Sequence, residues 1–171
     1  MVDYPNKPKW EALLRGQVMG TTTAKFMQVI RMLDQKAQIM ILLNSILIPF
    51  CIRAYQENMF THASVISIIT SLLSISAAII CIYPKRKHRK KEDPEINLLH
   101  FNDIGHMDRQ EFVDMFLPEF NDPSRLANLV VNDLYDTSKN AIIPKYVWLK
   151  IAYGVFFFGN LLAIIVAFLM M

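Results

Sequence analysis

Three long apolar stretches dominate the pattern of the chain. They run from Gln38 to Tyr55, from Ala63 to Tyr83 and from Val147 to Met171. No Asp, Glu, Lys or Arg occurs from Thr61 to Tyr83 or from Ile151 to Met171. A helix needs about 20 such residues to cross the bilayer core, and a backbone in lipid must satisfy its own hydrogen bonds. The pattern therefore predicts an all-α membrane protein with three transmembrane helices.

Two further apolar patterns have the spacing of a helix face. Their members lie three and four positions apart, which lines one side of a helix. The first comprises Phe26, Val29, Ile30, Leu33, Ala37 and Met40, and the second Leu126, Leu129, Val130, Leu134 and Ala141. Because such faces need a partner surface, they predict, together with residues 108–120, a small cytoplasmic helical bundle.

Capping residues predict the helix ends in the long polar region. Asp122 followed by Pro123 is a strong start signal, because proline suits the first helical position. Asp108 is expected to cap a helix that ends near Phe116 and is broken near Pro118.

Sequence signals mark the helices that lead into the first and third spans less sharply. Residues 1–20 are expected to be loose apart from one short helix near 10–14, and the threonines at 21–23 to serve as N-caps. Pro49 is expected to bend the first span, and Pro144 leaves a kink or a break before the third.

The distribution of charge predicts the orientation. The net charge is only +3, but six Lys or Arg occupy the seven positions 85–91, whereas the loop between the first two spans carries only Arg53 and Glu57. Lys and Arg accumulate on the cytoplasmic side of membrane proteins. The N-terminus and the long loop are thus expected in the cytoplasm and the C-terminus outside. The expected organisation is a cytoplasmic segment with an amphipathic helix at 1–37, a two-span hairpin at 38–83, a cytoplasmic basic and helical region at 84–146 and a third transmembrane helix at 147–171.

The basic run at 85–91 has three interpretations. It is most simply a topological flank, it also suits anionic lipid headgroups, and it suits a phosphate-bearing ligand. Charge alone does not separate them.

Small polar residues form a stripe along the second span. Ser64, Ser67, Ser71 and Ser74 follow one another at steps of three, four and three, and Ala78 continues the series. Serine stripes let membrane helices pack closely and hydrogen-bond across the contact, which is the favoured interpretation. The alternative is a weakly polar wall that lines a pore after subunits rearrange.

The sequence does not predict an enzyme. It contains no nucleophile elbow, phosphate-binding glycine loop or zinc pattern, and neither the second nor the third span carries a deeply buried charge of the kind that proton relays need. His100, Asp103 and His106 are spaced by three, but Gly105 nearby argues against the regular helix that a shared metal would require. No metal, cofactor or nucleic-acid partner is expected.

Two short motifs resemble a known family. The segment Leu33-Asp34-Gln35-Lys36-Ala37, running into the first span, is similar to the membrane entry of the transmembrane effectors of Pycsar, a bacterial antiphage system that signals through cyclic pyrimidine nucleotides. The segment from Leu129 to Tyr146, which ends in Lys145-Tyr146, resembles that family's approach to its last span. The motif residues are Asp34, Lys36, Ala37, Lys145 and Tyr146.

The resemblance implies a defence effector. A member of this family is expected to lie in the bacterial inner membrane as a homo-oligomer and to impair membrane integrity when a cyclic nucleotide appears. The rival hypotheses are a small accessory or scaffolding subunit of a larger complex and a membrane enzyme acting on lipid.

A cyclic nucleotide site needs cations and an aromatic ring. The phosphate is anionic, and the base stacks on rings. Two clusters fit: Arg31 and Lys36 with the basic run, and Phe101, His106 and Arg109. No recognisable nucleotide-binding domain is present, so a partner protein remains an alternative sensor.

The charge asymmetry makes a direct prediction. A topology reporter fused after Met171 should report the periplasm, and one inserted near Pro94 the cytoplasm. If both reporters give the same side, the three-span topology is wrong.

Overall fold

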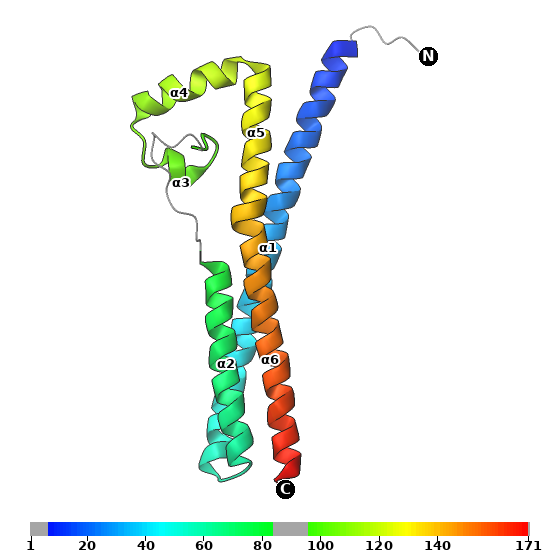
Figure 1. Cartoon of the computed structure of the whole chain (residues 1–171), viewed down its shortest axis with the longest axis vertical. Coiled ribbons are helices and arrows are strands. Elements are labelled where there is room, and N and C mark those ends of the chain that lie inside the picture. The colour runs from blue at the N-terminus through cyan, green and yellow to red at the C-terminus, as the bar shows by residue number, and fades with distance from the viewer. Residues whose placement is uncertain (1–6, 84–95, 171) are drawn as a thin grey trace. The chain divides into compact units, whose positions relative to one another are not determined.

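A computed structural model describes residues 7–83 and 96–170, and the regular elements in these residues are helices (Figure 1). The elements are α1 (Lys7–Gln56), α2 (Thr61–Ile82), α3 (Phe101–Ile104), α4 (Arg109–Asn121), α5 (Pro123–Thr137), a π-helix (Ser138–Ile142) and α6 (Ile143–Leu169). Three helical stretches are long and apolar enough to cross a membrane: Glu11–Gln56, Thr61–Ile82 and Pro123–Leu169. The predicted all-α membrane fold is therefore confirmed. The basic run at 85–91 lies outside the described residues.

The chain divides into two compact units. One combines residues 1–28 and 85–141 and is called the polar unit; the other combines 29–84 and 142–171 and is called the membrane unit. Each is described separately.

The first helix begins earlier than predicted. The expectation of a loose segment at 1–20 with a short helix near 10–14 is wrong for the described part, because α1 begins at Lys7. Helix growth adds one hydrogen bond per residue, so a helix nucleated in the span extends through Gly16 and Gly20 despite a cost of about 1 kcal/mol for each glycine.

The threonines at 21–23 are not N-caps. Their hydroxyls donate to the carbonyls of Gln17, Val18 and Met19 at 2.5, 2.8 and 3.0 Å, four residues back in the same helix. Threonine has this option inside a helix because its hydroxyl reaches the preceding turn.

The structure also bears on two predictions about prolines. The expected break near Pro118 is wrong, since α4 continues to Asn121 and Phe112, Phe116 and Phe120 stack along it at 5.1 and 5.6 Å. Pro118 is exposed, so water can take over the carbonyl left without a helical donor. Before the third span, the π-helix ends at Ile142, two residues before Pro144, and its wider turn accommodates the bond that proline cannot make.

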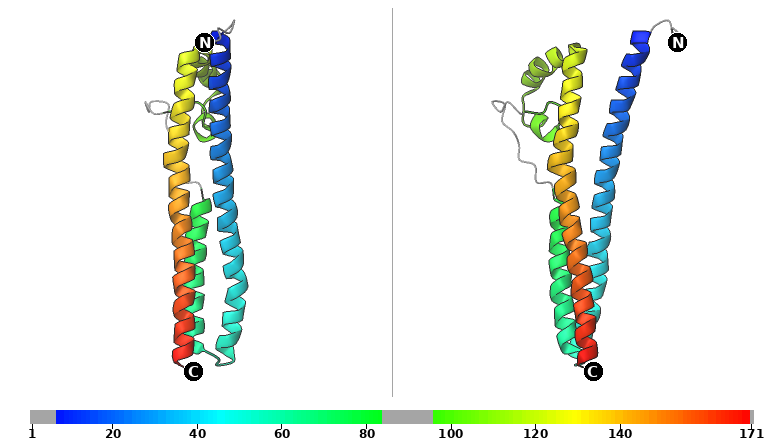
Figure 2. Two further views of the ribbon diagram at one scale, coloured as in Figure 1. Left: turned by 90° about the vertical axis from the view of Figure 1, so that its right-hand side faces the viewer. Right: turned by 45° about the vertical axis from the view of Figure 1, so that its right-hand side comes forward.

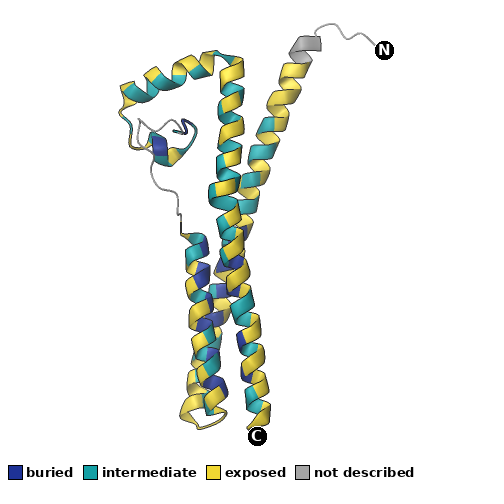
Figure 3. Ribbon diagram, viewed as in Figure 1, coloured by how far each residue is buried: buried dark blue, intermediate teal, exposed yellow. Residues whose placement is uncertain are grey.

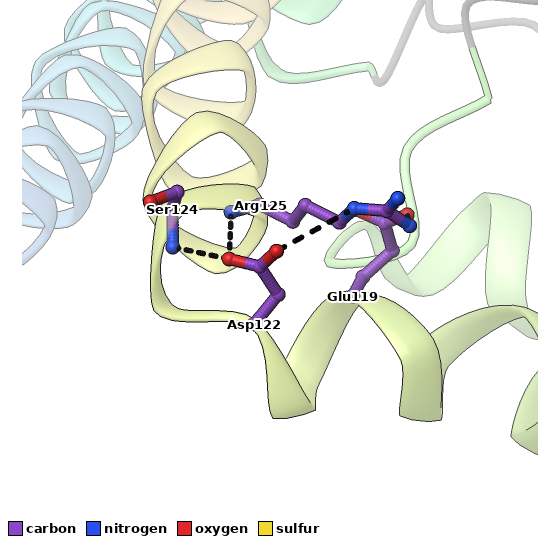
Figure 4. Close-up of polar contacts among 4 residues, drawn as sticks. All are labelled: Glu119, Asp122, Ser124 and Arg125. Carbon is purple, nitrogen blue, oxygen red and sulfur yellow. Dashed lines mark hydrogen bonds and ion pairs between the residues drawn. The ribbon is translucent and has the colours of Figure 1, made fainter.

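The predicted helix starts in the polar unit are confirmed. Asp108 and Glu111 form a capping box at the start of α4. Asp122 caps α5 by accepting from the backbone nitrogens of Ser124 and Arg125 at 2.8 and 3.3 Å (Figure 4). The Arg125 guanidinium reaches back to Glu119 and Asp122, which links α4 to α5.

The membrane unit is built around a tight contact between α2 and α6, which run side by side in both figures (Figures 1 and 2). A Cβ atom on Gly159 of α6 would overlap the Thr70 side chain of α2, so glycine is needed for this approach. Buried residues lie on the facing sides of the helices (Figure 3). The core cluster, which draws on α1 as well, comprises Leu33, Ala37, Met40, Ala77, Ala78, Cys81, Leu149 and Ala152.

The α1–α2 connection is short and sharply turned. Asn58 and Phe60 both have positive φ, at 55° and 51°. This end of the membrane unit is called the hairpin end.

Candidate functional site

The serine stripe lies inside the membrane unit. Ser64 and Ser67 are 6% and 5% exposed, and Ser71 and Ser74 are fully buried. Ser76, on the same helix but off the stripe, is exposed. Hydroxyls in an apolar interior need partners, so the stripe turns towards α1 and α6.

Polar groups from all three helices meet on this stripe. The Ser67 hydroxyl donates to Oδ1 of Asn160 in α6 at 2.7 Å. The Ser74 hydroxyl donates to the Ala152 carbonyl at 3.0 Å and accepts from Nδ2 of Asn44 in α1 at 3.2 Å. We call the four serines with Asn44 and Asn160 the polar seam.

Two seam atoms are left without a partner among the described residues. The Asn44 Oδ1 atom and the Ser71 hydroxyl are both fully buried and make no hydrogen bond. An unsatisfied buried polar group costs about 1–3 kcal/mol, and there is no bulk water in a bilayer to relieve it. The seam is thus more polar than packing alone requires.

A lysine joins the three helices at the end of the unit opposite the hairpin. The Lys145 ammonium donates to Asp34 Oδ1 of α1 at 2.5 Å and to the Ile82 carbonyl of α2 at 3.3 Å. The Lys145 carbonyl accepts from the Cys81 thiol at 3.2 Å. The Lys145 side chain is only 14% exposed. We call this arrangement the lysine clamp and this end the clamp end.

A cleft opens at the hairpin end, next to the first serine of the stripe. It has a volume of about 510 Å³ and is lined by residues 58–63 together with Val166, Ala167 and Met170. Asn58, Thr61 and His62 give it polar groups.

The predicted ligand residues fall into both units. Arg31 and Lys36 are exposed on α1 in the membrane unit. In the polar unit, Phe101 is 76% exposed and stacks on His100 at 4.8 Å, and Arg109 begins α4. His106 Nδ1 contacts the Asn102 carbonyl at 2.9 Å. A site made from these residues stays a prediction.

The three metal candidates have other roles. The His100 ring accepts from the Asn102 backbone nitrogen at 3.2 Å and caps α3. Asp103 is fully buried and accepts from the Asn97 backbone nitrogen at 3.2 Å. Among the described residues, no three His, Cys, Asp or Glu side chains gather as metal ligands would.

The motif residues gain a structural meaning. Asp34 and Lys145, which lie in the two separate motifs, form the clamp, and Ala37 is fully buried in the core cluster. Lys36 and Tyr146 are exposed beside them. The family profile of the Pycsar effector protein domain matches residues 19–171, which includes both motifs and the whole seam. This chain belongs to the Pycsar effector family. Comparisons with curated proteins and with solved structures found no match.

Sequence reasoning missed two residues that hydrogen-bond to the serine stripe of this Pycsar effector. No role is predicted for Asn44 or Asn160, yet each donates to or accepts from a serine of the stripe. The available signal was an amide within an otherwise apolar span, which marks a helix contact or a polar path.

The stripe makes a packing prediction. Ser67→Leu combined with Ser71→Leu should lower the thermal stability of the detergent-solubilised effector and abolish its activity, because leucines would hold α2 away from α6 and α1. Ile68→Leu with Ile69→Leu is the matched control. Equal tolerance of both pairs would show that the stripe is not a helix contact.

The lysine clamp makes an energetic prediction. In a double-mutant cycle with Asp34→Asn and Lys145→Met, the coupling energy measured by thermal unfolding should be about 2 kcal/mol, between the values for exposed and fully buried pairs. The exposed Arg53–Glu57 pair is the control and should show little coupling. Additive effects at Asp34 and Lys145 would contradict the clamp.

Proposed function

We propose that this Pycsar effector impairs the bacterial inner membrane during phage defence, when a cyclic nucleotide triggers it. Membership of the family supports the defence role. The observation that carries the membrane activity is the polar seam, which places unsatisfied hydroxyl and amide groups within a three-helix membrane unit.

The described conformation suits the resting state of such an effector. The core cluster and the lysine clamp hold α1, α2 and α6 together around the seam. A trigger that shifts α1 relative to the other two helices would break the Asp34–Lys145 pair and the Asn44–Ser74 bond together. The exposed polar groups would then favour water in the membrane, which is the chemistry of a leak.

In this proposal, cytoplasmic residues bind the cyclic nucleotide, and the effector works as a homo-oligomer. Arg31 and Lys36 are exposed beside the clamp, where a bound phosphate would act on α1 directly. The alternative cluster lies in the polar unit, where Phe101 offers an exposed ring for a base and Arg109 an exposed guanidinium. The orientation predicted from the charge distribution puts the N-terminus and the polar unit in the cytoplasm, where a cyclase product would appear.

Leakage from vesicles tests this function. The purified effector in lipid vesicles should release potassium when cyclic mononucleotides are added, and calorimetry should detect binding. Arg31→Ala tests the cluster in the membrane unit and Arg109→Ala the cluster in the polar unit, and one of the two changes should weaken binding at least tenfold, or about 1.4 kcal/mol, because it removes a phosphate partner. Arg53→Ala, near the hairpin end, is the control.

Other outcomes of the binding and leakage measurements would contradict separate parts of the proposal. Binding that neither change weakens would place the ligand site elsewhere. If no cyclic nucleotide binds, direct sensing is wrong; if triggered cells show no leak, the membrane function is wrong. Activity only with a second protein would favour the accessory-subunit hypothesis.

A further inference from the structure

We propose that the polar seam is a closed path for water and small monovalent cations, which enters at the hairpin cleft and is blocked by the core cluster at the clamp end. This inference rests on the proposed membrane function and names the residues that line its route. Ser74 lies ten positions after Ser64, or about 15 Å along the helix, which is half of a bilayer core about 30 Å thick.

The unpartnered atoms point to a ligand rather than to packing. Asn44 Oδ1 can only accept hydrogen bonds, whereas the Ser71 hydroxyl donates and accepts. Water supplies both complements. A seam that served helix contact alone would leave neither atom unsatisfied, because replacing Ser71 with alanine would remove its desolvation cost.

The entrance is a separate observation. The cleft at the hairpin end is lined by Asn58, Thr61 and His62, and it also touches Ala63, the residue before the first serine. Polar side chains at the mouth and serines beyond it form one succession of hydrogen-bonding groups. Under the proposed orientation this mouth faces the periplasm.

The barrier lies between Ser74 and the lysine clamp. Ala78 occupies the next position of the stripe but has no hydroxyl, and it is fully buried with Met40 and Leu149 in the core cluster. Apolar constrictions of this kind block conduction by excluding water. The path is therefore polar over its hairpin half and apolar over its clamp half.

The lining favours cations. It presents the oxygens of four serines, Asn44 Oδ1 and the Ala152 carbonyl, and no seam residue carries a charge. Oxygen dipoles replace the hydration shell of a small cation. At the clamp end the Lys145 charge is compensated by Asp34.

Adding a hydroxyl to the barrier tests the path without a trigger. Ala78→Ser should raise the resting potassium leak of vesicles at least tenfold, while a trapped anionic dye of larger size stays inside. Ile79→Ser is the matched control, because Ile79 is 51% exposed on the outside of the unit. In the Ala78→Ser protein, adding Ser71→Ala should return the leak to the resting level, and Ser76→Ala should not.

A second measurement is independent of any leak. Single cysteines are introduced into a cysteine-free background (Cys51→Ser, Cys81→Ala), and a small cationic methanethiosulfonate is applied to cells from outside. The reagent should modify Ser64→Cys at least tenfold faster than Ala78→Cys. It should also modify Ser64→Cys faster than the lipid-facing Ile69→Cys. Ala78→Cys reacting as fast as Ser64→Cys, or Ser64→Cys reacting as slowly as Ile69→Cys, would overturn the path.

The two proposals fail separately. If the wild-type effector leaks on triggering and Ser71→Ala leaks equally, the membrane function stands and the path is wrong. If the wild type never leaks but Ala78→Ser does and Ser71→Ala reverses it, the path stands and the proposed membrane function is wrong. An Ala78→Ser leak no larger than that of Ile79→Ser overturns the path.

Discussion

The absence of water inside a bilayer is the constraint on which this structure depends. The helices satisfy their own backbones, but the side chains of Asn44, Asn160 and the serine stripe must find partners within the protein. That requirement turns one face of α2 inward and brings an amide from α1 and another from α6 onto it. Because Gly159 has no side chain, α6 can approach Thr70 of α2 closely, and this approach keeps the bonds between the helices short. A larger side chain at position 159 would hold the helices apart.

The lysine clamp applies the same constraint at the membrane boundary. A lysine ammonium has three donors and is a compact charge, so it can serve a carboxylate and a carbonyl at once. Lys145 uses Asp34 of α1 and the Ile82 carbonyl of α2 while belonging to α6 itself. One side chain thereby connects all three spans, and the two charges of the clamp come from the two separate segments that resemble the Pycsar effectors.

The seam and the core cluster make opposite contributions to the stability of the membrane unit. The cluster of Leu33, Met40 and Leu149 stabilises the bundle by close packing of apolar groups, whereas the unpaired oxygens of Asn44 and Ser71 destabilise it. Departures from complete polar satisfaction in an otherwise consistent fold are expected at functional sites. The proposed function needs both features, because a seam without a barrier would leak and a barrier without a seam could not open to water.

Local patterns in the sequence determined the three spans, the caps at Asp108 and Asp122 and the inward face of the serine stripe, because bilayer thickness, capping and helical periodicity act over neighbouring residues. They misjudged α1 and Pro118, where the cooperativity of a long helix outweighs single glycines and an exposed proline. Only the tertiary structure joined Asp34 to Lys145, across 111 positions, and the stripe to its two amides. Those contacts depend on how the helices are rotated and shifted against one another, and no local pattern specifies rotation or shift.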